Sequence, residues 1–291
     1  MAVRIAVASG KGGTGKTTVA TNLYHAVNRQ GEAEALLVDC DVEEPNDALF
    51  FPGVTPEKVT TVTQEIPEID THICTFCRKC VDYCEFNAIV VIPPAEFAEV
   101  NPSLCHSCGA CMVACPVDAL RVRNEPVGTI TSYRDQDGKS ILEGRLQIGS
   151  AMQTMMIRSL KRTIGNWEQI IVLDTPPGTS CPVVETISDA NFVLLVTEPT
   201  PFGLHDLKLM VSLVRELGIP FGVVINKANL GDKKIYRYLC KEQIELIGEI
   251  PFSRTYAEKY ARADLFQQVP GEIRAAHRQI SMKLSEKGLI P

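Results

Sequence analysis

The run GKGGTGKTT at residues 10–18 constrains the fold of this 291-residue chain more than any other segment. A short apolar stretch rich in valine and isoleucine, Val3 to Ala8, comes directly before it. After it, apolar side chains recur at helical spacing over residues 17–29. The order strand, glycine-rich loop, helix is typical of α/β folds, in which such a loop connects a buried strand to the helix that covers it.

The same run supports phosphate binding, because it matches the pattern G-x-x-x-x-G-K-[ST] in the required position between a strand and a helix. Its glycines let backbone N–H groups turn toward a phosphate, and the helix N-terminus adds a positive dipole end. Lys16 would reach the β- and γ-phosphate oxygens, and Thr17 would offer its hydroxyl to Mg²⁺. We therefore expect ATP with Mg²⁺ here, rather than a glycine-rich turn that binds nothing. The expected contacts are Gly10, Lys11, Gly12, Gly13, Thr14, Gly15, Lys16, Thr17 and Thr18.

Acidic residues follow two further apolar strands, which we expect over residues 36–38 and 170–173. Ligands of doubly wound sheets bind at the carboxyl ends of the strands, so these side chains would lie near the glycine loop. We expect Asp174, in LDTPPG, to hold Mg²⁺ through a water molecule, with Asp39 supporting the ion from farther out. Asp41 would orient or activate the attacking water, although turn formation is an alternative role for it.

Other candidate contacts also come after strands. Gly178 could present its backbone N–H to the γ-phosphate. The nucleotide base would lie beside Asn226 and Lys227, which follow FGVVI, and beside Pro251 and Phe252, which follow IGEI. These base contacts rest on position alone.

The rest of the chain continues the alternation of strands and helices. We expect a helix over 152–164, and then a strand, a helix, a strand, a helix and a strand over 192–196, 205–217, 221–225, 233–244 and 246–250. Before these, residues 128–146 predict a hairpin with Asp137-Gly138 as its turn. Continuous β-branched strands between helices favour a doubly wound, mostly parallel sheet covered on both faces. The core domain would comprise residues 1–65 and 126–291, with residues 66–125 as an insertion.

The insertion holds eight of the 11 cysteines, in two copies of C-x-x-C-x-x-C-x-x-x-C. This spacing is that of bacterial ferredoxins, in which three cysteines bind one [4Fe-4S] cluster and the fourth binds the other cluster. Zinc is the less favoured alternative, because paired C-x-x-C zinc sites lack the third cysteine of each run. The expected ligand sets are Cys74, Cys77, Cys80 and Cys115 for one cluster, and Cys105, Cys108, Cys111 and Cys84 for the second.

Two smaller expectations concern the residues around these eight cysteines and the three cysteines outside the insertion. We expect nearby apolar residues to form the packing around the clusters, namely Ile73, Phe86, Ile89, Val113 and Leu120. The isolated cysteines, Cys40, Cys181 and Cys240, are expected to be buried structural thiols.

Composition excludes several classes of function. The net charge is -6, and residues 67–125 alone carry eight acidic side chains against four basic ones, so nucleic acid is not the expected partner. No apolar run approaches the roughly 20 residues that span a bilayer. The N-terminus is interpreted as a first strand and not as a secretory signal, so we expect a cytoplasmic protein. We expect the C-terminal helix of residues 271–290 to dock on the sheet rather than to anchor the chain to a membrane.

KGGTGKTT, VDCDVEEPN and DTPPGTS together resemble the deviant Walker A ATPases, which include MinD and Mrp-type proteins, ParA and the nitrogenase iron protein. With the inserted ferredoxin-like α+β domain, the chain is similar to a group of MinD-superfamily ATPases. The resemblance implies a P-loop NTPase fold, ATP hydrolysis, and a nucleotide-dependent dimer with itself or with a paralogue. It also implies that Lys11 reaches the phosphates bound to the partner subunit, where a second cation would stabilise the transition state as an arginine finger does.

Two complete sites in one chain suggest that ATP gates electron transfer between the ferredoxin domain and a redox partner or metalloprotein. One alternative is a positioning or complex-assembly ATPase whose clusters sense redox state. Another is an iron-sulfur cluster carrier, which is less favoured because four cysteines per cluster retain a cluster rather than release it.

Overall fold

A single large sheet organises the chain, for which the computed structural model describes residues 2–30, 34–134, 140–165, 167 and 169–291. Within these residues nine strands hydrogen-bond in the order β11-β10-β9-β1-β8-β2-β7-β6-β3. The strands of the sheet are β1 (Val3–Ala8), β2 (Ala35–Asp39), β3 (Thr55–Ile69), β6 (Leu120–Arg134), β7 (Ser140–Leu146), β8 (Ile170–Asp174), β9 (Phe192–Thr197), β10 (Phe221–Asn226) and β11 (Leu246–Ile250). All neighbouring strands from β11 to β7 pair in parallel, whereas the pairs β7–β6 and β6–β3 are antiparallel. The expected mostly parallel α/β sheet is confirmed.

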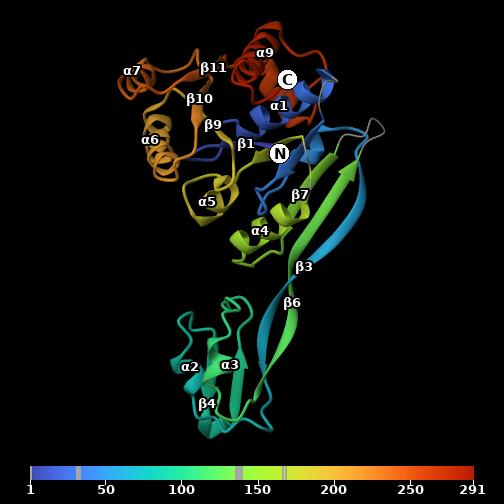
Figure 1. Ribbon diagram of the computed structural model, residues 1–291, viewed down its shortest axis with the longest axis vertical. Helices are drawn as coiled ribbons and strands as arrows, with labels where there is room; N and C mark the ends of the chain where they lie inside the picture. Colours follow the sequence, from blue (N-terminus) through green and yellow to red (C-terminus); the bar gives the residue numbers. More distant parts are fainter. Residues whose placement is uncertain (1, 31–33, 135–139, 166, 168) are drawn as a thin grey trace.

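Helices cover both faces of this sheet (Figure 1). On one face lie α1 (Lys16–Gln30), α8 (Arg254–Ala261) and α9 (Gly271–Glu286), and on the other α4 (Gln153–Thr163), α5 (Cys181–Ile187), α6 (Pro201–Glu216) and α7 (Lys234–Lys241). The side chains of β1 alternate between the two cores: Ile5 and Val7 join the first, and Ala6 and Ala8 join the second.

The C-terminal helix α9 docks on the sheet as expected. Ile273, Ala276, Ile280 and Leu284 are all buried, and α9 contacts β11. Gly248 of β11 makes this close approach possible, because a Cβ atom there would lie 2.4 Å from Ile280 Cγ1. In the part of the chain that the structure describes, no helix is long and apolar enough to cross a membrane.

Two sequence expectations are met only in part, and three short elements were not expected. Helix α7 ends at Lys241, before the expected residue 244, because Gln243 has a left-handed backbone with φ of 54°. The hairpin is confirmed, since β6 pairs with β7 from Gly128↔Leu146 to Arg134↔Ser140, but its expected turn at Asp137-Gly138 lies outside the described residues. The short elements α5, α8 and the 3-10 turn η1 (Asp47–Phe50) carry too few residues to show a periodic pattern.

A two-stranded ribbon made of β3 and β6 extends beyond the sheet (Figure 1). The two strands pair as far as Ile69↔Leu120, whereas β7 pairs with β6 only to Gly128. The eight residues 120–127 therefore project by about 25 Å at the usual rise of a strand. Because β7 is parallel to β2, the ribbon leaves the sheet at the carboxyl ends of the parallel strands.

The ribbon carries a small lobe of residues 70–119, which lies at its far end in Figure 1. The lobe holds α2 (Lys79–Asp82), β4 (Ile89–Ile92), η2 (Pro93–Ala95), β5 (Phe97–Val100) and α3 (Ala110–Ala114), with β4 and β5 as a separate antiparallel pair. It has its own hydrophobic cluster, to which Ile66 of the ribbon contributes a fully buried side chain. The side-chain amide of Gln64 also donates to Pro102 O at 3.3 Å, so the lobe is fastened to the ribbon.

The expected packing around the cysteines is only partly correct. Ile89 and Leu120 are buried in the cluster of the lobe, but Val113 is 88% exposed, and Ile73 and Phe86 are about two-fifths exposed. The reason is the shortness of α3, whose inward position is taken by Cys111, so that Val113 faces outward.

Candidate functional site

The glycine loop lies between β1 and α1, at the carboxyl edge of the sheet. Two of its glycines are required by close approach. A Cβ on Gly10 would lie 2.6 Å from Asp206 O, and Gly15 combines φ of 93° with contact to the side chain of Asn226. Asn226 itself donates from Nδ2 to Thr14 O at 2.8 Å, which ties the end of β10 to the loop.

Lys16, Thr17 and Asp174 come together next to this loop. Thr17 Oγ1 donates to Asp174 Oδ2 at 2.6 Å, while Asp174 Oδ1 is buried without a hydrogen-bond partner among the described residues. Burial raises the pKa of Asp174 to about 6, and the nearby charge of Lys16 opposes this rise. Lys16 is itself 93% buried, with only 7% exposed. A hydroxyl, a carboxylate with a free oxygen and a buried ammonium group are a suitable donor set for a magnesium-bound phosphate.

Asp39 and Asp41 have different surroundings. Asp39 lies opposite Asp174 in the β2–β8 register and is buried. Its carboxylate accepts from the backbone N–H groups of Asp41, Asn46 and Asp47 at 2.8 to 3.1 Å, so it shapes the loop that follows β2. Asp41 is half-buried; burial raises its pKa and Lys16 lowers it. The charge of Lys16 acts on Asp41, so the two side chains lie on the same side of the site, and a role for Asp41 in orienting water stays a prediction.

Asp47 is a buried carboxylate that the sequence reasoning missed. It is fully buried, and neither of its oxygens has a hydrogen-bond partner among the described residues. Burial, followed by the charges of Asp39 and Asp174, raises its pKa well above the ordinary value. Its position in the short turn η1 gave no periodic signal, although the residue directly follows the motif VDCDVEEPN, which was an available signal.

The remaining expected contacts lie around the same edge at different distances. The N–H of Gly178 donates to Ser9 O at 3.0 Å, so a phosphate could accept from it only by replacing that bond. Lys227 Nζ donates to Gly13 O at 3.2 Å, which brings it to the glycine loop. Pro251 and Phe252 follow β11, farther from the loop, and Phe252 N donates to Asn229 Oδ1 at 2.6 Å.

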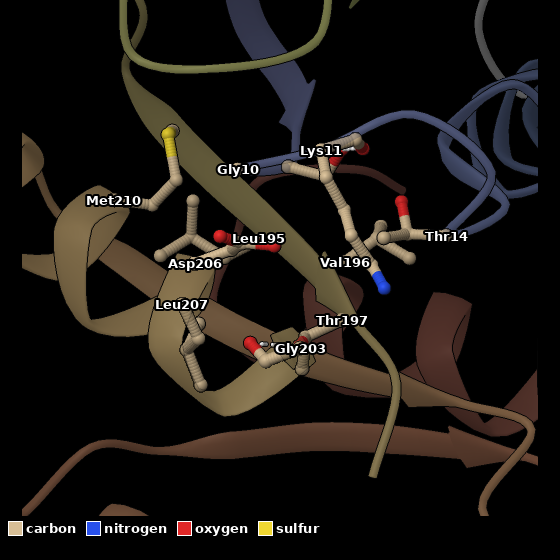
Figure 2. Close-up of a pocket in the computed structure, with 11 residues that line it drawn as sticks. Gly10, Lys11, Thr14, Leu195, Val196, Thr197, Gly203, Asp206, Leu207 and Met210 are labelled. Atoms are coloured by element: carbon tan, nitrogen blue, oxygen red, sulfur yellow. Dashed lines mark hydrogen bonds between the residues drawn. The ribbon is translucent and has the colours of Figure 1, made fainter. Parts of the chain in front are cut away.

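The side chain of Lys11 folds back into its own subunit. Figure 2 shows it leaving the loop and running past Val196 toward Thr197, along a small pocket between β9 and α6. Its Nζ lies 2.5 Å from Glu198 Oε1. Glu198 is a second residue that the sequence reasoning missed. The position of Glu198 directly after β9 was an available signal, because every other proposed contact beyond the loop also follows a strand.

The loop after Asp39 is also connected to the ribbon. Val42 O accepts from Leu146 N at 2.7 Å, and Arg145 Nη2 donates to Pro45 O at 3.4 Å. The Val42 side chain is buried in a cluster with Leu146 and with Val127, which lies where the ribbon leaves the sheet. The residue next to Asp41 is therefore hydrogen-bonded to Leu146, which pairs with Gly128 where the ribbon leaves the sheet.

In the lobe, eight cysteines line two separate hollows. Cys74, Cys77, Cys80 and Cys115 line one, and Cys84, Cys105, Cys108 and Cys111 line the other. The fourth cysteine of each run thus lies with the first three of the other run, the crossed arrangement that the spacing predicts.

Backbone geometry around the hollows repeats every 31 residues, like the cysteines themselves. The left-handed residues form three such pairs, Phe76 and Ser107, Arg78 and Gly109, Asn87 and Asp118. Backbone N–H groups donate to four of the sulfurs at 3.3 to 3.5 Å, from Phe76 to Cys74, from Ser107 to Cys105, from Ala88 to Cys84 and from Ala119 to Cys115. Such donors stabilise thiolates that carry negative charge.

Outside the two hollows, the structure bears on sites for single metal ions and on the three isolated cysteines. Among the described residues, no three His, Cys, Asp or Glu side chains converge closely enough to hold one metal ion. Cys40 is buried as expected, but the same expectation was wrong for Cys181 and Cys240, which are exposed. In α7 the buried positions include Ile235 and Leu239, so the next residue, Cys240, turns about 100° away from the core.

Comparisons with known proteins agree with this fold. Over 285 residues the chain is 28% identical to an uncharacterized protein of Methanocaldococcus jannaschii, covering 98% of this chain and 97% of that one. It is 27% identical to a protein of Aquifex aeolicus named as an iron-sulfur cluster carrier protein, covering 97% and 67% of the two chains. The solved structure of the cell division ATPase MinD of Pyrococcus furiosus superposes with a TM-score of 0.60 at 17% identity, covering 99% of this chain and 100% of that one.

The family model of the CobQ/CobB/MinD/ParA nucleotide binding domain matches residues 5–266. This match spans the glycine loop, the acidic strand ends, the ribbon and the lobe. The chain belongs to the CobQ/CobB/MinD/ParA family of nucleotide-binding domains.

Proposed function

We propose that this chain is a magnesium-dependent ATPase whose nucleotide-driven dimerisation gates electron transfer through an inserted ferredoxin-like domain, residues 66–125. The observation that carries the proposal is the connection of the two sites. The loop that follows Asp39 and Asp41 is hydrogen-bonded, through Val42 O, to Leu146 at the base of the ribbon that holds the cysteine lobe, and Val42 shares one buried cluster with Leu146 and Val127.

The nucleotide chemistry follows from the residues at the glycine loop. Lys16 would neutralise the β- and γ-phosphate oxygens, and Thr17 directly and Asp174 through water would hold Mg²⁺, whose charge would stabilise these oxygens during hydrolysis. Asp41 would orient the attacking water, while Asp39 keeps the loop of Asp41 in place through its three backbone bonds. The family name and the MinD fold support nucleotide binding and hydrolysis.

The cysteine hollows fit two [4Fe-4S] clusters, because each offers four sulfurs around one space and backbone N–H donors aimed at two of them. Cys74, Cys77, Cys80 and Cys115 would hold one cluster, and the other four cysteines the second. When bound, the clusters would supply one-electron transfer. Cys77 and Cys108 are exposed, so an electron-transfer partner could approach each set closely.

Dimerisation is proposed from Lys11, whose early position in the loop is that of a lysine acting on a neighbouring subunit. The partner subunit would be a second copy of this chain or a paralogue. The redox partner would dock on the lobe, which is acidic, so we expect it to present basic side chains. A cytoplasmic location accords with eight cysteines kept for metal in a reducing compartment.

A second candidate, transfer of iron-sulfur clusters to acceptor proteins, is favoured by the name of the Aquifex aeolicus relative. The exposure of Cys77 and Cys108 would also allow an acceptor thiol to reach either set. Buried Cys80, Cys105 and Cys111 favour retention instead.

One experiment separates the two candidates. The anaerobically purified protein is reduced, and electron transfer to a one-electron acceptor is timed with a non-hydrolysable ATP analogue, with ADP and without nucleotide. Gating predicts rates that differ between nucleotides, and a Lys16→Ala control that shows no difference. Equal rates in all three conditions would overturn gating. Iron loss to an apo-ferredoxin within minutes, measured in the same samples, would establish the carrier function.

A further inference from the structure

Lys11 has a defined partner within its own subunit, which the proposed trans role does not explain. Its Nζ and Glu198 Oε1 are 2.5 Å apart, and the Glu198 side chain is only 13% exposed. Glu198 is ionised in this setting: burial acts to raise its pKa, but hydrogen bonds from Lys11 and Lys227 outweigh burial and lower the pKa overall. The pair is therefore a partly desolvated ion pair, which is stronger than a fully exposed one.

The other oxygen of Glu198 is held independently. Lys227 Nζ lies 2.9 Å from Glu198 Oε2 and also donates to Gly13 O. The backbone of the segment is fixed as well, because Thr200 caps helix α6 by accepting from Gly203 N, and its hydroxyl lies 3.3 Å from Glu198 Oε1. If the Lys11 side chain moves away, Lys227 still neutralises the Glu198 carboxylate. The movement therefore does not leave a buried carboxylate without a counter-ion.

We propose that Glu198 is a positioning residue that holds Lys11 in its own subunit and competes with the partner's nucleotide phosphates for its ammonium group. This inference rests on the proposed function, in which Lys11 acts across the dimer. The exchange costs one ion pair and forms another, so it is reversible. The nucleotide on the partner subunit decides which ion pair Lys11 forms. ATP carries a γ-phosphate that attracts the lysine more strongly than ADP does, so ATP favours the pair across the dimer and ADP favours the pair with Glu198.

The Lys11–Glu198 ion pair therefore opposes dimerisation, because it must break before Lys11 can reach the partner subunit. Without Glu198, the ammonium group of Lys11 would be available to the partner subunit at no cost. We expect Glu198→Gln, which keeps the shape and removes the charge, to lower the protein concentration for half-maximal ATP-dependent dimerisation about fivefold. Glu198→Asp should act in the same direction, because its shorter side chain cannot hold Lys11 and Lys227 in the present geometry at the same time.

The experiment measures dimer fraction by sedimentation, and ATP hydrolysis against protein concentration, for Glu198→Gln, Glu198→Asp and the wild-type holoprotein. Glu242→Gln is the matched control, since Glu242 forms a 2.8 Å ion pair with Arg215 between α6 and α7, away from the glycine loop. The decisive comparison repeats Glu198→Gln in a Lys11→Ala background. If Glu198 acts through Lys11, the double variant behaves like Lys11→Ala alone.

Three outcomes are informative. A fivefold shift that disappears in the Lys11→Ala background supports the inference. A shift that persists there, or no shift in either Glu198 variant while Lys11→Ala impairs hydrolysis, overturns it and leaves the trans role of Lys11 intact. Unchanged hydrolysis in Lys11→Ala overturns the trans role itself, and the inference with it.

Discussion

Shortening Val42 to alanine tests the connection between the nucleotide site and the lobe. Val42 is 2% exposed, accepts a hydrogen bond from Leu146 N at the base of the ribbon, and belongs to the buried cluster that includes Leu146 and Val127. Removing two buried methyl groups costs about 2 kcal/mol of unfolding free energy, from lost burial and the cavity that remains. The backbone bond from Leu146 N to Val42 O does not depend on the side chain, so the strand arrangement should persist.

The expected functional effect is a loss of communication, not of nucleotide binding. Residues along such a connection change coupling by about 1 kcal/mol, which is about fivefold in a rate or an equilibrium. Hydrogen exchange of peptides covering residues 120–127 should differ between ATP analogue and ADP in the wild-type holoprotein. In Val42→Ala this difference should shrink about fivefold, while the affinity for nucleotide stays within about twofold.

Val214→Ala is the matched control for this experiment. Val214 belongs to the same buried cluster but lies on α6, away from the ribbon, and it is fully buried. It should lose a similar amount of stability and keep the full nucleotide response. If both variants keep the response, the path through Val42 is wrong. If the wild type shows no response, the gating proposal is wrong.

Two further predictions concern the cysteines and the pH dependence of stability. Cys115→Ser should remove the cluster signal of the first run, Cys74 to Cys80, and spare the second, as read by iron content and electron paramagnetic resonance; loss of the second signal instead would refute the crossed ligand sets. Burial lowers the pKa of His277 from 6.5 to about 4. The unfolded chain therefore takes up a proton that the folded chain does not, and unfolding free energy should fall by about 3 kcal/mol as pH drops from 7 to 4. His277→Leu should remove that part of the pH dependence in urea unfolding, and an unchanged slope would show that His277 does not cause it.

Three of the carboxyl groups near the glycine loop differ in their hydrogen bonding, which their positions in the sequence do not reveal. Asp174 keeps one oxygen without a partner, which suits it to a cation. Asp39 uses both oxygens to organise the following loop. Asp47, which we did not expect at the site, is buried beside both. Burial raises the pKa of each of these carboxyl groups, so a divalent cation bound beside them would favour their ionised forms.

Local sequence determined the parts of the molecule that depend on near neighbours. The strand, loop and helix at residues 3–30 follow from periodicity and from glycines that only a tight turn requires. The sheet could also be expected, because β-branched runs alternate with helices. The two cysteine runs fixed their own crossed grouping, since the spacing of each run allows three sulfurs to surround one space while the fourth points away.

Only the tertiary structure decided which distant residues meet. Glu198 lies 187 positions from Lys11, and nothing in either segment indicates an ion pair. The packing of Val42 on Leu146 likewise depends on the parallel pairing of β2 and β7 across the inserted ribbon. The physical reason is that periodicity and turn chemistry act over a few residues, whereas ion pairs and core contacts depend on strand order. The sequence therefore determined the chemistry that this protein can carry, and the order of strands in the sheet decided how its two sites are connected.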